Sequence, residues 1–210
     1  EALKDAEHPL IHTFIATSEI HMEHKLRKNA DQVLEIAVAA VKQARNLCPE
    51  VEYSAEDATR SDWDFLCRIL AATIKAGATV INVPDTVGYT TPDEFKKLLA
   101  HLRAHTEGLD RVVLSVHCHN DLGMAVANSM AAATAGADQI ECTINGLGER
   151  AGNAALEEVV MALHTRPELF EAGTRINTEQ IYRTSARGGP RAGRAGARHK
   201  AILGRHAVSP

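Results

Sequence analysis

The chain has few cysteines, and none is placed as in a disulfide framework or a zinc motif. The sequence contains only Cys48, Cys67, Cys118 and Cys142, with neither a C-x-x-C pair nor a short disulfide-like spacing. This usage favours reduced thiols in a cytosolic setting. Asn, Ser and Thr interrupt the longest apolar stretches, which fall short of a membrane span. No signal peptide is visible either, since the chain begins EALKDAEHPL. We therefore expect a cytoplasmic protein without a membrane partner.

A strong excess of charge of one sign is absent as well. The net charge of −4 at neutral pH gives no reason to expect nucleic acid or an anionic membrane as a partner. With 45% hydrophobic and 24% charged residues, the 210-residue chain has an ordinary globular composition and enough material for one sizeable domain. The first residue is Glu1 rather than methionine, from which we expect a fragment or a processed product.

Strand-like and helix-like segments alternate along most of the chain. Short apolar stretches, each followed by apolar residues at helical spacing, predict strands at residues 10–15, 51–57, 78–86, 112–117 and 138–143. Ser61 with Asp64 resembles a capping start for the second of the predicted helices. Five such units predict parallel strands joined by right-handed crossovers, hence an α/β barrel or a doubly wound sheet.

Polar residues follow the predicted strands at the points where the strands end. They are Ser54 and Glu56, Asp85 and Thr86, His117 and His119, and the glycine-rich loop from Asn145. A site built from many consecutive strand ends is typical of a (β/α)8 barrel, whereas a doubly wound sheet concentrates its site at one switch point. We therefore predict an α/β fold that forms part of a (β/α)8 TIM barrel, because five strands are fewer than the eight of a closed barrel.

A pair of histidines is the main candidate for a metal site. His117 and His119 are two residues apart on a predicted strand, so their side chains leave the same face and Cys118 points the other way. Two imidazoles form half of a site for Mg²⁺, Mn²⁺ or Zn²⁺, which would need additional oxygen ligands. Asn153 would add an amide oxygen if its loop folds over the strand ends. The alternative is that one histidine belongs to the core.

The segment NGLGERAGN at residues 145–153 has three glycines between a predicted strand and a predicted helix. Its backbone amides could approach a phosphate or an oxyanion, although the spacing does not match the dinucleotide-binding fingerprint. A purely structural glycine turn is the alternative. Glu149 and Arg150 are charged residues inside a tight loop, and such residues at a barrel rim favour a functional role.

Other candidates have both a functional and a structural interpretation. Glu56, on the same strand face as Ser54, is either a base or electrostatic anchor or a carboxylate that favours a helix dipole. His12 is either a core histidine or a substrate contact. Thr86 is either a site residue or part of a turn.

The motifs that carry these residues resemble the 2-isopropylmalate synthase family. This family lies within a wider group of Claisen-condensing and aldol-cleaving TIM barrels that includes homocitrate and citramalate synthases and hydroxymethylglutaryl-CoA lyase. The resemblance covers residues 1–185, through IHTFIATSEIHMEHKLRK, VEYSAEDATR, INVPDTVGYTTP, SVHCHNDLGMAVANS and NGLGERAGNAALEEV, of which the last two are highly specific. It implies a partial barrel domain, roughly strands 3 to 7 with their helices.

The resemblance implies a role for each candidate residue. Three of the four metal ligands would be His117, His119 and Asn153, while the fourth, an Asp in a first-strand R-D-G motif, has no counterpart here. The α-keto acid pocket would be lined by His12, Ser54, Glu56 and Thr86. The acetyl-CoA side would be formed by Asn145, Gly146, Gly148, Glu149 and Gly152.

The implied reaction is that of an acyltransferase, which condenses acetyl-CoA with 2-oxoisovalerate in the first committed step of leucine biosynthesis. It requires a divalent metal (Mn²⁺, Mg²⁺ or Zn²⁺), and Glu56 and Glu149 are candidates for its proton transfers. The resemblance also implies a homodimer for the full-length enzyme. The family's catalytic subdomain and regulatory domain, which follow the barrel, also have no counterpart here, so we expect the chain alone to be inactive. The alternatives are a homocitrate or citramalate synthase, a lyase or aldolase of the same group, or a non-catalytic truncated fragment.

Residues 186–210 depart from this pattern. The stretch ARGGPRAGRAGAR at 186–198 has no apolar periodicity and predicts an irregular Arg/Gly-rich tail. It could be an RGG-like nucleic-acid arm, but the acidic remainder of the chain favours an irregular segment without such a partner. KAILG at 200–204 resembles a K-A-I-V-G stretch of the family. We therefore hypothesise a compensated reading-frame shift between Ala186 and His199.

Overall fold

The sheet follows the order of the chain. The computed structural model describes residues 2–170, 172–191 and 198–204. Five parallel strands pair in the order β1-β2-β3-β4-β5. They are β1 (Leu10–Ala16), β2 (Glu50–Glu56), β3 (Val80–Asp85), β4 (Val113–Cys118) and β5 (Gln139–Glu141). This sequential order has no switch point, so the arrangement is that of a barrel and not of a doubly wound sheet, as predicted.

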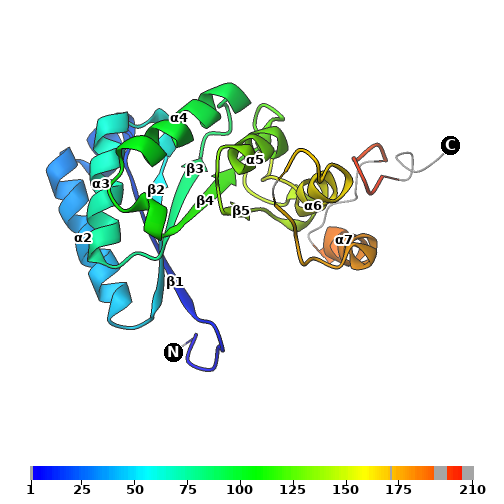
Figure 1. Cartoon of the computed structure of the whole chain (residues 1–210), viewed down its shortest axis with the longest axis horizontal. Helices are drawn as coiled ribbons and strands as arrows, with labels where there is room; N and C mark the ends of the chain where they lie inside the picture. Colours follow the sequence, from blue (N-terminus) through cyan, green and yellow to red (C-terminus); the bar gives the residue numbers. More distant parts are fainter. Residues whose placement is uncertain (1, 171, 192–197, 205–210) are drawn as a thin grey trace.

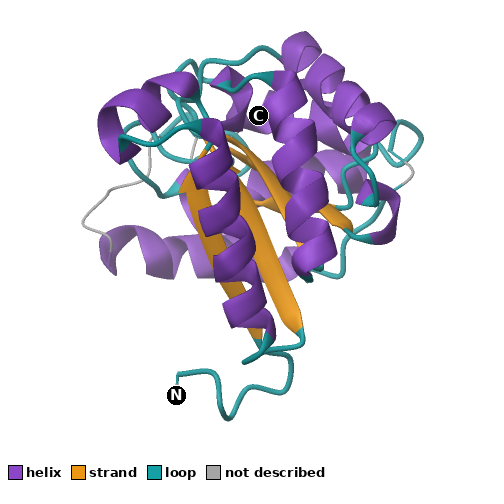
Figure 2. Cartoon of the chain, turned by 90° about the vertical axis from the view of Figure 1, so that its left-hand side faces the viewer, coloured by secondary structure: helices purple, strands orange, loops and turns teal. Residues whose placement is uncertain are grey.

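Five helices pack side by side on one face of the sheet, and the first four of them connect consecutive strands. They are α2 (Ala30–Arg45), α3 (Trp63–Ala76), α4 (Pro92–His105), α5 (Ala125–Thr134) and α6 (Leu156–Thr165). Each contacts the next along the chain, and the row follows the sheet from β1 toward β5 (Figure 1). Seen from the side in Figure 2, helices stand in front of the strands. Parallel strands joined by crossovers of one hand lead to this one-sided arrangement.

The two faces of the strands differ in chemistry. On the helix side, Tyr53, Ile81 and Leu114 are fully buried against helix residues such as Ile69 and Leu99. Successive side chains in a strand point to opposite faces, so the intervening residues form a second row. We call this row the polar face; it consists of His12, Glu52, Ser54, Asn82, Ser115, His117, Gln139 and Glu141. The candidate site is built on this polar face.

The strand ends shift by one or two residues from the predicted ones, and two boundaries differ for a clear physical reason. The helix α3 begins after Asp62, whose side chain accepts a hydrogen bond from the backbone N–H of Phe65 (2.8 Å). The predicted cap, Ser61, instead donates to the carbonyl oxygen of Asp57 (2.9 Å). Strand β5 ends at Glu141 rather than at residue 143, because Thr143 leaves the sheet and forms an isolated bridge with Ala155.

Helix α7 (Ile181–Arg191) and the described residues beyond it follow the row of five helices. This helix comes after a 3-10 turn, η5 (Thr178–Gln180), and extends into the segment predicted to be irregular. Residues 192–197 and 205–210 lie outside the described residues, so the division at residue 185 stays a prediction. Beyond α7, Lys200 forms ion pairs with Glu157 and Glu158 of α6 (2.7 Å each). Within the described ranges, no helix is both long and apolar enough to cross a membrane.

Candidate metal and substrate site

Three side chains of the polar face form a hydrogen-bonded row across adjacent strands. The Nε2 atom of His12 on β1 lies 2.7 Å from the hydroxyl of Ser54 on β2. The side-chain amide of Asn82 on β3 donates to the same hydroxyl (2.9 Å). Burial lowers the pKa of His12, which favours the neutral imidazole. The structure thus brings together the predicted residues His12 and Ser54 and adds Asn82.

The two histidines lie at the carboxyl end of β4 with their rings facing each other. The Nε2 atoms of His117 and His119 are 3.2 Å apart, while Cys118 between them is fully buried on the other face. The Nδ1 atom of His117 lies 3.0 Å from a carboxylate oxygen of Glu141. A proton on this Nδ1 leaves the Nε2 lone pair directed toward His119. Metal-binding histidines usually have such a carboxylate behind them.

Asn153 is brought to the histidines by a short antiparallel pairing. The backbone N–H of Asn120 donates to Gly152 (2.8 Å), and that of Ala154 donates to Cys118 (3.0 Å). Asn153 and His119 are therefore direct bridge partners. Among the residues that the structure describes, the buried side-chain oxygen of Asn153 has no hydrogen-bond partner. Buried polar atoms normally have a partner, so this oxygen points to a missing ligand.

These donors fit a divalent metal ion. Two ligand nitrogens about 2.1 Å from one ion lie roughly 3 Å apart, close to the separation of the two Nε2 atoms. Burial, and then the neighbouring His117, lower the pKa of His119 and favour the neutral ring that a metal requires. In the parts of the chain that the structure describes, no group of three His, Cys, Asp or Glu could hold a metal. The donor set is therefore two imidazoles and an amide, and further oxygen ligands would have to come from elsewhere.

The glycines of the loop at 145–153 allow its chain to fold tightly. Gly146 and Gly152 have positive φ angles of 65° and 98°. A Cβ atom on Gly152 would overlap the carbonyl oxygen of Gly146, and one on Gly148 would lie 2.7 Å from the side-chain oxygen of Asn153. The N–H groups of Gly146, Gly152 and Asn153 donate to carbonyls inside or next to the loop. These three N–H groups therefore hold the loop together and are not free for a phosphate.

The other predicted residues of this loop differ in their surroundings. The backbone N–H of Asn145 donates to Glu157 (3.0 Å), and its side chain contacts Ser185 of α7. The carboxylate of Glu149 is largely exposed and lies 3.5 Å from Arg150. The structure therefore does not bring Asn145 or Glu149 into hydrogen-bond contact with the histidine pair, and their predicted role on the acetyl-CoA side stays a prediction.

Two predicted residues at strand ends are held by specific contacts. Glu56, at the end of β2, accepts a hydrogen bond from Lys25 (2.6 Å). Lys25 comes from a π-helical turn, η1 (Met22–Leu26), and such turns are frequent at functional sites. The hydroxyl oxygen of Thr86 accepts from the backbone N–H of Asp57 (2.9 Å). No acceptor for the hydroxyl proton of Thr86 is found within the described ranges.

Sequence reasoning missed a pair of carboxylates in the middle of the polar face. Burial, followed by a hydrogen bond with Glu141, raises the pKa of Glu52 to about 8, so Glu52 is protonated at neutral pH. Burial also opposes ionisation of Glu141, but hydrogen bonds from His117, Glu52 and Ser115 outweigh it and lower its pKa. Glu52 stands two residues before Ser54, so the sequence places both side chains on the same face of the strand. This spacing was the only sequence signal for a carboxylate in the middle of the polar face.

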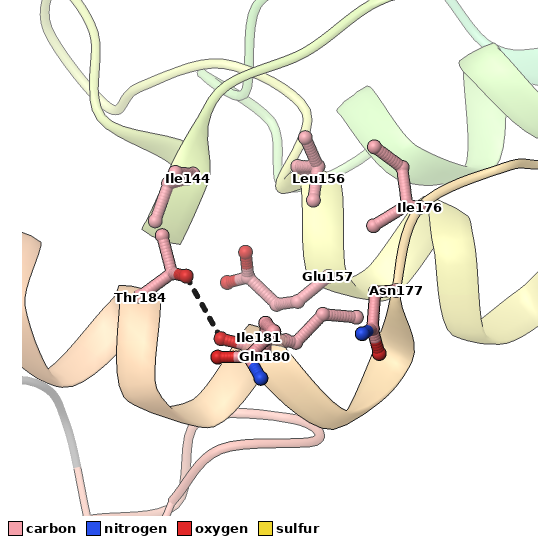
Figure 3. Close-up of a pocket in the computed structure, with 8 residues that line it drawn as sticks. All are labelled: Ile144, Leu156, Glu157, Ile176, Asn177, Gln180, Ile181 and Thr184. Carbon is pink, nitrogen blue, oxygen red and sulfur yellow. Dashed lines mark hydrogen bonds between the residues drawn. The ribbon is translucent and has the colours of Figure 1, made fainter.

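A separate pocket lies beside the start of the glycine-rich loop. It has a volume of about 220 Å³ and lies where α6 and α7 meet the 3-10 turn η4 (Ile144–Gly146) (Figure 3). Its lining consists of Ile144, Leu156, Glu157, Ile176, Asn177, Gln180, Ile181 and Thr184. None of the residues predicted for the site lines this pocket, so we do not assign it to the site.

Comparison with known proteins supports both the family and the fold. A family model described as HMGL-like matches residues 1–187. The chain is 58% identical over 209 residues to the 2-isopropylmalate synthase of Pelotomaculum thermopropionicum, which covers 100% of the chain and 41% of that protein. It is 60% identical over 185 residues to the 2-isopropylmalate synthase of Pyrococcus furiosus, covering 88% and 37% respectively. The chain thus spans about two fifths of the length of these curated relatives.

Solved structures with the same fold include two lyases. Hydroxymethylglutaryl-CoA lyase from Pseudomonas aeruginosa superposes with a TM-score of 0.76 at 20% identity, covering 89% of this chain and 64% of that one. An HMG-CoA lyase from Acinetobacter baumannii, in complex with coenzyme A and 3-methylmalate, superposes with a TM-score of 0.76 at 17% identity. The match covers 96% of this chain and 68% of that one. At these identities the likeness concerns the fold alone.

Proposed function

The chain belongs to the HMGL-like family, and we propose that it contributes the metal-binding and 2-oxo-acid-binding strands of a 2-isopropylmalate synthase. Such an enzyme is an acyltransferase that condenses acetyl-CoA with 2-oxoisovalerate. The observation that carries the proposal is the close approach of the His117 and His119 Nε2 atoms, 3.2 Å apart, beside the side-chain oxygen of Asn153, which has no hydrogen-bond partner among the described residues. The high identity to curated synthases supports the choice of reaction.

The residues of the chain would divide the work between holding a metal and binding the 2-oxo acid. His117, His119 and Asn153 would hold Mn²⁺, Mg²⁺ or Zn²⁺, and Glu141 orients His117 through its Nδ1 atom. When bound, the ion would supply Lewis-acid polarisation of the keto carbonyl. The two imidazoles suit Zn²⁺, and the amide oxygen with additional oxygen ligands suits Mn²⁺ and Mg²⁺.

The row of His12, Ser54 and Asn82 would bind the 2-oxo acid. The hydrogen bonds among these three side chains fix their polar atoms on the open side of the sheet. The hydroxyl proton of Thr86 would donate to a substrate oxygen, since the oxygen of that hydroxyl is already an acceptor for Asp57. A preorganised set of donors of this kind costs no rearrangement during the reaction.

Proton removal from the acetyl-CoA methyl group requires a base. Glu56 is one candidate, because its carboxylate lies at the end of β2, where it accepts a hydrogen bond from Lys25. Glu149 is the other, on the loop that we propose faces acetyl-CoA together with Asn145, Gly146, Gly148 and Gly152. We further propose that the enzyme works as a cytoplasmic homodimer in leucine biosynthesis.

Metal binding by the chain tests the proposal. Free Mn²⁺ is measured by electron paramagnetic resonance for the wild type and for His117→Ala, His119→Ala and Asn153→Ala. We expect each substitution to weaken Mn²⁺ binding by at least about tenfold. We also expect 2-oxoisovalerate to tighten Mn²⁺ binding to the wild type. The control is His8→Ala, because the side chain of His8 is 91% exposed and remote from the polar face.

Release of coenzyme A then tests the expected inactivity of the chain alone. The chain is mixed with acetyl-CoA, 2-oxoisovalerate and Mn²⁺, and free thiol is measured with a thiol reagent; we expect no release above background. The assigned substrate is tested by Mn²⁺ affinity, which we expect 2-oxoisovalerate to tighten more than 2-oxoglutarate does. Equal Mn²⁺ affinity in the wild type and the three variants contradicts the proposed site.

A further inference from the structure

Arg150 reaches back from the glycine-rich loop to the ends of two strands. Its backbone has a left-handed conformation (φ 53°), which is uncommon for a residue with a side chain. Its guanidinium forms a two-pronged contact with Asp121, at 2.8 Å and 3.0 Å. A third hydrogen bond, of 2.7 Å, goes to the carbonyl oxygen of Thr86. The planar guanidinium matches a carboxylate in this geometry, which a lysine cannot reproduce.

These contacts join three segments that carry predicted site residues. Asp121 lies two residues after His119, and Thr86 directly follows β3. The two strand-end segments also touch each other, because the backbone N–H of Leu122 donates to Gly88 (3.0 Å). The guanidinium of Arg150 adds the glycine-rich loop to this assembly.

The position of Asn153 depends on how this loop is held. At its base, the two backbone hydrogen bonds that flank Asn153 attach the loop to the end of β4. At its tip, Arg150 is the residue that contacts Asp121 and Thr86. A loop attached only at its base would open more often, and the amide oxygen of Asn153 would move away from the histidine pair.

We propose that Arg150 and Asp121 are positioning residues, whose ion pair holds the loop at 145–153 on the strand ends and keeps Asn153 in reach of His117 and His119. The inference rests on the proposed metal site. Arg150 and Asp121 are 43% and 27% exposed, so their ion pair adds little to the stability of the whole fold. Its effect is local, on the loop and on the affinity for the metal.

Substitutions in the full chain test this proposal with two readouts. The first is Mn²⁺ affinity from paramagnetic resonance, and the second is amide hydrogen exchange of residues 145–154. We expect Arg150→Ala to weaken Mn²⁺ binding about tenfold, as is typical for residues that orient metal ligands, and to speed exchange in the loop. Arg150→Lys and Asp121→Asn should give smaller losses of about threefold, because each keeps part of the contact.

Arg166→Ala is the matched control. Arg166 forms an exposed ion pair with Glu168 after α6, outside the residues proposed for the site. We expect this substitution to leave both Mn²⁺ affinity and loop exchange unchanged. Thermal melting of all variants checks that each is folded. If Arg150→Ala does not fold, the Mn²⁺ affinity and loop exchange of Arg150→Lys and Asp121→Asn decide whether the ion pair holds the loop.

The outcomes separate this inference from the proposed function. If the wild type binds Mn²⁺ and Arg150→Ala binds it equally well, the inference is overturned while the metal site stands. If the wild type binds no divalent metal, the proposed function fails. The role of Arg150 in holding the loop is then decided by the amide hydrogen exchange of residues 145–154 alone. In that case, faster amide hydrogen exchange of the loop in Arg150→Ala than in Arg166→Ala supports a role for Arg150 in holding the loop. Equal exchange in the two variants overturns it.

Discussion

The two faces of the sheet are made by the same strands, but one is packed with apolar side chains and the other carries a network of polar side chains. In β4, Leu114 and Val116 pack among helix residues, while Ser115 and His117 between them take part in a hydrogen-bond network. A side-chain period of two allows one strand to serve both purposes without a separate scaffold. The difference shows that the pairing register of the strands sets both the core and the candidate site. A slip of one residue would turn the apolar side chains toward the site and the polar side chains into the core.

The helix-side face is expected to carry most of the stability. Leu114→Ala removes a fully buried side chain, and we expect it to lower the free energy of unfolding by about 2–5 kcal/mol. Ser115→Ala, equally buried but on the polar face, should cost no more than about 1–2 kcal/mol. It loses the hydrogen bonds with Glu141 and Gln139 but leaves almost no cavity. Urea denaturation of both variants measures this contrast, and equal losses would contradict it.

Asp85 is the polar exception on the helix side of β3. Its carboxylate is fully buried and accepts hydrogen bonds from Thr59, Thr90 and Asn128. Asp85→Ala leaves these donors without an acceptor, and we expect a loss of about 2–4 kcal/mol. Asp85→Asn keeps an acceptor oxygen and should cost roughly half as much. Thermal melts of the two variants test this order, which would be wrong if the alanine variant were the more stable.

Glu52 makes the stability of the polar face depend on pH. In the unfolded chain its carboxyl has the ordinary pKa of 4.5, whereas in the folded chain burial raises its pKa to about 8. Between these values the folded state binds more protons, so this residue makes the free energy of unfolding fall as pH rises from about 5 to 8. Glu52→Gln stays neutral and should gain about 1–3 kcal/mol over the wild type at pH 8, with little change at pH 5.

Melting temperatures at the two pH values check this prediction. Glu50→Gln is the control, because Glu50 lies on the same strand but is exposed. A pH dependence that is the same in Glu52→Gln as in the wild type would exclude a buried protonated carboxyl at this position.

The smallest expected effect concerns the ion pair at the end of β2. Lys25 is 50% exposed, so solvent screens its contact with Glu56. Lys25→Ala should therefore cost less than about 1 kcal/mol, and the loss should shrink further at high salt. Denaturation at low and high salt measures it. A loss that is large and independent of salt would show that Lys25 acts through packing instead.

Much of the fold followed from periodicity in the sequence. Short apolar stretches predicted the five strands, because this signal depends only on neighbouring residues. The apolar residues at helical spacing between them predicted helices, and five such strand–helix units predicted parallel strands. The boundaries that were wrong depend on tertiary contacts: Ser61 is drawn to the backbone of Asp57 instead of capping α3, and Thr143 pairs with Ala155 instead of extending β5.

The candidate site was predictable only in part. His117, His119 and Asn153 stand in recognisable motifs, and His12 and Ser54 could be assigned through the same resemblance. The carboxylates of Glu52 and Glu141 could not, because their pairing depends on strands far apart in the sequence. The contact between Arg150 and Asp121 likewise exists only once the loop has folded over the end of β4.

The central claim, that the polar face ends in a divalent metal site, is tested most directly by nitrogen-15 NMR of the histidine rings during a titration with Zn²⁺. We predict that the Nε2 resonances of His117 and His119 shift together as one equivalent of Zn²⁺ is added. The Nδ1 of His117 should remain protonated beside Glu141. If both Nε2 resonances stay unchanged while Zn²⁺ binds elsewhere, or does not bind at all, the account of the site is wrong.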